Sequence, residues 1–157
     1  MFKYLPITAL LFPCFAFATS FDGCYAHQEA ITDVVSGSHE KKISYVKISR
    51  NESDYLVRGV LWGGNFHICY IQSTEEGTDN PLSMSRVGDS LIYTESDPEY
   101  DIYCKLEMKL KGDVLHIEDA NFDCNRIFSC GARVGLNNTD LKKSPGMCSE
   151  SPDISED

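Results

Sequence analysis

Residues 101–110 read DIYCKLEMKL, and the alternation within this stretch is the clearest structural signal in the chain. Every second residue is apolar and those between are mostly polar, which is the period of a β-strand with one buried face and one wet face. The predicted inward side chains are Ile102, Cys104, Leu106, Met108 and Leu110. The turn signal Lys111-Gly112-Asp113 comes next, and a second alternating run at 114–119 places Leu115 and Ile117 inward. We therefore predict an antiparallel hairpin.

Short alternating runs separated by turn residues continue outward from this hairpin in both directions. Further strands are predicted at 21–28, 42–49, 54–62, 65–72, 82–86, 91–95 and 132–136. No run of helical period is long enough to compete, so the predicted fold class is all-β. About eight strands joined by short turns favour a single small antiparallel β-barrel, because closure removes unpaired strand edges. A two-sheet β-sandwich is the alternative.

The two ends of the chain differ from its body. Residues 1–18 contain Lys3, a largely apolar run and the small-residue sequence Ala16-Phe17-Ala18, which predicts a secretory signal peptide cleaved after Ala18. The apolar run is shorter than the roughly 20 residues of a membrane-spanning helix. Residues 149–157 are rich in acidic residues and poor in apolar ones, which predicts a disordered acidic tail. Residues 19–148 are predicted to form one β domain.

Six cysteines remain once the signal peptide is removed, and an even number in a small exported chain predicts three disulfides. Spacing alone does not choose among the 15 pairings that six cysteines allow. We predict a bridge from Cys69 to Cys104, because both lie in predicted strands. Cys124 and Cys130 enclose a short loop, so their mutual pairing is the easiest closure. Cys24 and Cys148 remain, and their pairing would join the two ends of the domain.

Charge restricts the classes of partner. Loss of Lys3 leaves 13 basic residues against 24 acidic residues, a net charge of −11. Such a chain repels phosphate backbones and anionic lipid headgroups, so we expect no nucleic acid and no membrane as partner and favour a cationic protein. The sequence contains none of the hydrolase, nucleotide-binding or zinc-protease motifs, and we predict no catalytic residue, no metal and no cofactor.

Exposed loops are where binding residues concentrate on a rigid β scaffold. The longest predicted loops are 30–41, 73–81 and 96–100, and the first contains Ser36, Gly37, Ser38 and His39. Tyr103 is a further candidate, because it lies on the polar face of the strand at 101–110. Each loop could equally be a plain connection, and Tyr103 could equally be an aromatic residue on the wet face of the sheet.

Four short motifs lie around the cysteines: Phe21-Asp22-Gly23-Cys24-Tyr25, Asn65-Phe66-His67-Ile68-Cys69, Cys104-Lys105-Leu106 and the segment from Cys124 through Cys130-Gly131-Ala132-Arg133. Together they resemble a layout found in small exported proteins of Gram-negative bacteria, including the periplasmic lysozyme inhibitors. The resemblance spans residues 21 to about 143. It implies an eight-stranded barrel that offers a polar loop to the cleft of an enzyme, and Ser36-Gly37-Ser38 looks like such an inhibitory loop.

The sequence thus predicts a periplasmic or secreted non-enzymatic binding protein. A cationic muramidase or a toxin neutralised by an immunity protein is the expected partner. The glycine and aromatic at the start of the first strand also look like the opening of lipocalin-type barrels. The alternative function is therefore a carrier of a small apolar ligand, which requires an interior that side chains leave open.

Overall fold

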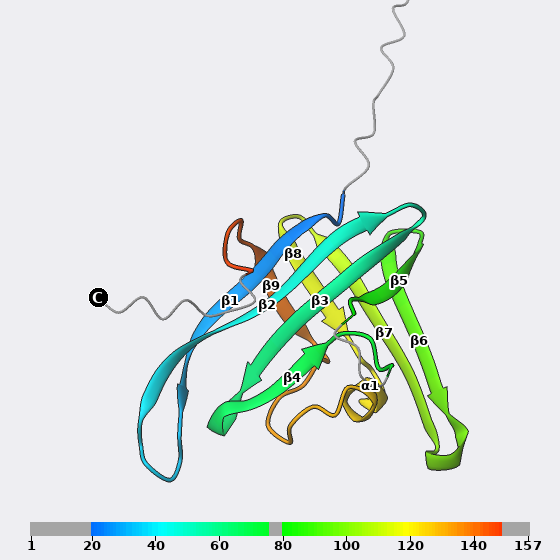
Figure 1. Ribbon diagram of the computed structural model, residues 1–157. Coiled ribbons are helices and arrows are strands. Elements are labelled where there is room, and N and C mark those ends of the chain that lie inside the picture. The colour runs from blue at the N-terminus through cyan, green and yellow to red at the C-terminus, as the bar shows by residue number, and fades with distance from the viewer. Residues whose placement is uncertain (1–19, 76–79, 149–157) are drawn as a thin grey trace, which may run out of the picture.

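One antiparallel sheet closes on itself in the computed structural model, which describes residues 20–75 and 80–148 (Figure 1). The elements are β1 (Gly23–Thr32), β2 (His39–Asn51), β3 (Asp54–Gly63), η1 (Gly64–Phe66), β4 (His67–Ile71), β5 (Leu82–Val87), β6 (Ser90–Asp97), η2 (Pro98–Tyr100), β7 (Ile102–Lys111), β8 (Val114–Glu118), α1 (Asp123–Ile127) and β9 (Thr139–Lys143). The predicted signal peptide and acidic tail lie outside the described residues. No helix within the described ranges is long and apolar enough to cross a bilayer.

The strand order confirms the predicted barrel. Neighbours follow the order β2-β1-β9-β8-β7-β6-β5-β3-β4, and β2 also pairs with β3, which closes an eight-stranded wall. β4 stands outside this cycle because it shares one edge of β3 with β5. The start of β3, residues 54–57, pairs with β5, and its end, residues 59–63, pairs with β4. The wall therefore branches along β3.

The inward face of the β7–β8 hairpin forms part of the core, as its alternation predicts. Leu106, Met108, Leu115 and Ile117 are fully buried, and Leu110 packs against them at the edge. The turn between the strands contains Gly112 at φ 68°, a conformation that glycine adopts without steric penalty. These side chains join those of the opposite wall in one cluster of buried residues.

Helix α1 lies between β4 and β7 (Figure 1), and the segment that contains it is bonded covalently to both strands. Cys104 of β7 pairs with Cys124 of α1, and Cys69 of β4 pairs with Cys130, with Cα–Cα distances of 4.5 and 4.2 Å. The predicted bridges Cys69–Cys104 and Cys124–Cys130 are therefore wrong. Three strands separate β4 from β7 in the sheet order, so their cysteines do not meet. The segment between Cys124 and Cys130 is mostly helix, not the short loop predicted.

The third predicted bridge is confirmed, and it lies beside the shortest seam of the barrel. β1 and β9 pair through only two residue pairs, Tyr25 with Lys143 and Ala26 with Lys142. Cys24 and Cys148 are bonded next to this seam, with a Cα–Cα distance of 5.6 Å. The N–H of Ser144 also donates to the carbonyl oxygen of Cys24, at 2.8 Å. The disulfide thus joins β1 to the segment that follows β9, beside their two-pair ladder.

Several segment boundaries differ from the sequence prediction, and two of these differences lie in or beside the hairpin that β1 and β2 form. Residues 132–136 form no strand, because they pack against the end of β3: the N–H of Gly64 donates to the carbonyl oxygen of Arg133, at 3.2 Å. The last strand is instead β9. In addition, half of the predicted loop 30–41 is strand, since β1 reaches Thr32 and β2 begins at His39.

Candidate functional site

The hairpin of β1 and β2 extends beyond the barrel wall (Figure 1). Its ladder continues to the pair Thr32 and His39, whereas the pairing of β2 with β3 ends at Tyr45. At this branch point the hydroxyl of the buried Ser44 accepts a hydrogen bond from the Trp62 N–H, at 2.9 Å, so a side chain continues the ladder after the backbone pairing stops. We call residues 27–44 the arm and residues 33–38 its tip.

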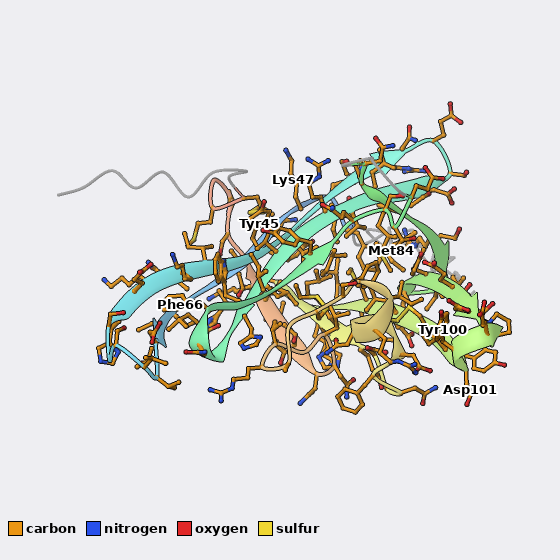
Figure 2. All side chains as sticks on the ribbon, turned by 60° about the horizontal axis from the view of Figure 1, so that its bottom comes forward. Tyr45, Lys47, Phe66, Met84, Tyr100 and Asp101 are labelled. Atoms are coloured by element: carbon orange, nitrogen blue, oxygen red, sulfur yellow. A yellow bond between two sulfur atoms is a disulfide. The ribbon has the colours of Figure 1, made fainter. Side chains whose placement is uncertain are left out.

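The arm is fastened to the segment that follows β3. The N–H of Val34 donates to the side-chain oxygen of Asn65, at 3.1 Å. The ammonium of Lys42 lies 5.0 Å from the ring centre of Trp62 and 5.5 Å from that of Phe66, which is within cation–π range. Figure 2 shows Phe66 beside the arm. A two-stranded ribbon alone is at best marginally stable in water, so these contacts hold the arm in one orientation.

The carboxylate of Asp33 organises the tip. One of its oxygens accepts hydrogen bonds from the N–H groups of Val35 and Ser36, at 2.7 and 2.9 Å. The N–H of Gly37 donates to the Asp33 carbonyl, at 2.8 Å, and Gly37 takes a φ of 72°, where a side chain is disfavoured. The hydrogen bonds to its carboxylate lower the pKa of Asp33 below its ordinary value. Asp33 therefore stays ionised near neutral pH and holds the turn preformed.

The four residues predicted for the first loop come together at the end of the arm. Ser36, Gly37 and Ser38 form the turn, and the two hydroxyls are 2.9 Å apart. His39 begins β2, and its Nδ1 lies 2.8 Å from the hydroxyl of Thr32 at the base of the tip. All are exposed.

The sequence reasoning missed the apolar part of the tip. Val34 is 62% exposed and Val35 is 91% exposed, so both methyl-bearing side chains point into solvent. Two adjacent β-branched residues directly before a Ser-Gly-Ser turn are the signal that could have identified them. The tip thus presents a small apolar end with hydroxyls beside it.

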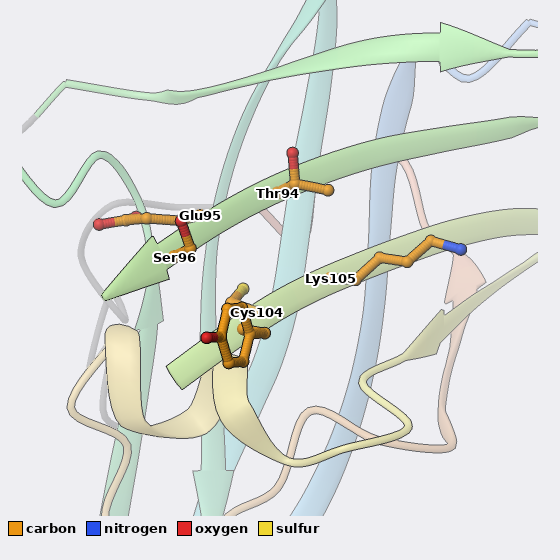
Figure 3. Close-up of a pocket in the computed structure, with 6 residues that line it drawn as sticks. Thr94, Glu95, Ser96, Cys104 and Lys105 are labelled. Carbon is orange, nitrogen blue, oxygen red and sulfur yellow. The ribbon is translucent and has the colours of Figure 1, made fainter. Parts of the chain in front are cut away.

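Tyr103, the other predicted site residue, lies on a different hairpin and does not meet the arm. Its side chain is 55% exposed on the outer face of β7, where it borders a shallow groove of about 290 Å³. Figure 3 shows this groove between β6 and β7, with Thr94, Ser96 and Lys105 along it. The structure therefore separates the predicted site residues into two surfaces.

A third surface feature is a polar pocket of about 310 Å³ at the root of the arm. His27, Glu29 and Ser44 of the arm line it together with Trp62 and Arg133. Within residues 20–75 and 80–148, no group of three or more His, Cys, Asp or Glu side chains is arranged to hold a metal ion.

No protein family, curated protein or solved structure matches this chain. The geometry of the arm is therefore the basis for assigning a function.

Proposed function

We propose that this chain is a periplasmic or secreted binding protein, acting without catalysis, that neutralises a cationic protein by placing the arm tip in that protein's cleft. A lysozyme-like muramidase is the most natural target, and a toxin recognised by an immunity protein belongs to the same class. The observation that carries the proposal is Val35, which is 91% exposed at the end of a turn that Asp33 fixes. A preformed protruding tip is suited to insertion because little conformational entropy is lost when it binds.

Charge supports the same class of target. The whole chain has a net charge of −10, and removal of the predicted signal peptide makes it −11. Attraction to a cationic partner speeds encounter more than it fixes affinity. Burial of the exposed valine would supply affinity, with about 1.5 to 3 kcal/mol for complete transfer from water. Three disulfides suit a binding scaffold in an oxidising compartment.

The carrier alternative has less support. It requires an open apolar interior, whereas Leu106 and Met108 pack with the opposite wall at 0% exposure. The grooves and pockets described above are bordered by outer or end residues and are shallow or polar. We therefore rank the inhibitor first.

A muramidase assay tests the proposal directly. The full chain is expressed with export, purified in its oxidised form and added to a c-type lysozyme that is clearing bacterial cell walls. We expect inhibition at micromolar protein or below. Val35→Ser should raise the inhibitory concentration by about tenfold or more, since a tenfold change corresponds to about 1.4 kcal/mol.

Val87→Ser is the matched control for this variant. Val87 is 62% exposed at the end of β5, on a hairpin away from the arm, so the same loss of methyl groups there should leave inhibition unchanged. Undiminished lysozyme activity with the unmodified protein at micromolar concentration contradicts the muramidase proposal.

A further inference from the structure

A second exposed apolar surface lies at the end of the β6–β7 hairpin. Tyr100, Tyr103 and Phe122 are 62%, 55% and 56% exposed. Two hydrogen bonds bring their loops together: the Arg126 guanidinium donates to the carbonyl oxygen of Tyr100, and the N–H of Tyr103 donates to the carboxylate of Asp123, each at 3.1 Å. We call Tyr100, Tyr103 and Phe122 the aromatic surface.

Phe122 is unfavourable to the fold in two respects. Its φ is 60° and its ψ is 13°, in the left-handed region where a bulky side chain is a genuine outlier. More than half of the residue's surface also remains in water, so packing does little to compensate for that backbone conformation. Glycine or asparagine would suit this backbone better. Strained residues of this kind cluster at functional sites, which points to a role in contact rather than in stability.

The residues around the aromatic surface are mainly acidic. Glu99 and Asp101 are exposed, and among the described residues neither carboxylate forms a hydrogen bond or ion pair. The nearby cation Arg126 is already committed, because it lies 3.6 Å from the carboxylate of Asp123. Figure 2 shows Tyr100 and Asp101 together at the tip of this hairpin. Such a surface complements exposed lysine and arginine, and tyrosine is among the residues that most often dominate protein interfaces.

The aromatic surface and the arm tip lie at the same end of the barrel. In Figure 1 the two hairpins project downward on either side of α1, and Figure 2, which turns that end forward, shows them on opposite sides of it. Both surfaces are therefore open to a partner that approaches this end. We propose that the aromatic surface is a second contact for the same cationic protein that the arm tip engages. This inference rests on the proposed function and adds to it the position of a second contact.

Calorimetric titration of the oxidised full-length product with a c-type lysozyme tests the second contact. Phe122→Asn and Tyr100→Ser should each weaken binding about tenfold, whereas the control Val87→Ser should not. Phe122→Asn should at the same time leave the midpoint of urea unfolding unchanged or raise it, because it relieves the backbone. A role in packing would instead lower that midpoint.

The contribution of the acidic residues is tested by the rates of association and dissociation. The double variant Glu99→Gln with Asp101→Asn should slow association several-fold at low salt and have little effect on dissociation. Lysozyme with acetylated lysines should bind more weakly. With that lysozyme, this variant and the unmodified protein should associate at the same rate.

The outcomes separate this inference from the function on which it rests. If Val35→Ser weakens binding and both aromatic variants bind like the unmodified protein, the second contact is wrong and the inhibitor proposal stands. A loss of stability in Phe122→Asn also overturns the second contact. If the unmodified protein does not bind lysozyme at all, both proposals fail.

Discussion

Removal of the Asp119 carboxylate should destabilise the protein strongly. Asp119 is 1% exposed and follows the end of β8. Its carboxylate accepts hydrogen bonds from the N–H groups of Cys124 and Asn125, at 3.3 and 3.1 Å, and its own N–H donates to the Asn137 side chain, at 3.1 Å. Asp119 therefore joins β8, the first turn of α1 and the loop before β9.

The magnitude follows from the two N–H groups that lose their acceptor. A hydrogen bond to a charged group contributes about 1.5 to 3 kcal/mol, and a buried donor left unpaired carries a similar penalty. Asp119→Ala should therefore lower the free energy of unfolding by about 3 to 5 kcal/mol. Asp119→Asn retains one carbonyl oxygen as acceptor and should lose about half of that. Urea unfolding of the oxidised protein, followed by circular dichroism at pH 7, measures both.

The pH dependence gives the same residue a second test. Burial raises the pKa of Asp119 above its ordinary value, and the hydrogen bonds from Cys124 and Asn125 only partly oppose this. A group whose pKa is raised in the folded state contributes stability below its unfolded pKa, and this contribution is lost as pH rises through the folded pKa. The stability of the unmodified protein relative to Asp119→Asn should therefore increase as pH falls through the raised folded-state pKa towards about 4, and should stay constant below that pH. A loss of stability below about 1 kcal/mol for Asp119→Ala would show that these hydrogen bonds do not hold the three segments together.

Three further predictions concern other parts of the barrel. Replacing both Cys24 and Cys148 by serine should lower the free energy of unfolding by about 5 kcal/mol in the chain-entropy model, because this bridge spans 124 residues; chemical denaturation measures the loss. Burial and the neighbouring Glu95 carboxylate raise the pKa of Tyr93 to about 12. Tyr93→Phe should therefore remove the last step of a titration that follows tyrosinate absorbance. The stability that this tyrosine contributes below pH 10 should be lost as pH rises towards 12. Gly63→Ala should destabilise by about 3 kcal/mol, because its Cβ would lie 2.1 Å from the Arg133 carbonyl oxygen, whereas Gly64→Ala, with 3.7 Å to the nearest side-chain atom, should be tolerated.

Local pattern determined the parts of the fold that the sequence predicted well. The β7–β8 hairpin combines strict alternation with a glycine turn, and both signals depend only on neighbouring residues. The turn between β5 and β6 at Gly88 is identified in the same way. Barrel closure followed because the strands are short and most of their connections are tight.

Tertiary contacts determined the parts that the sequence did not reveal. Helix α1 has five residues, too few for a helical period, and its position between two strands selects the disulfide partners. The burial of Asp119 depends on the loop that returns over it from Asn137, a contact that neighbouring residues in the sequence do not reveal. The sequence did not predict the exposure of Val35 either, because that exposure depends on the arm extending beyond the barrel wall.

The short strand β9 protects the molecule against association with its own copies. It lies between β1 and β8, so its departure would uncover two strand edges at once. Unpaired edges are templates for pairing with another chain and for aggregation. The ladder to β1 is only two residue pairs long, and the bond between Cys24 and Cys148 keeps the end of β9 beside it. Reduction of that single bond would therefore favour intermolecular β-pairing before the rest of the barrel loses its core.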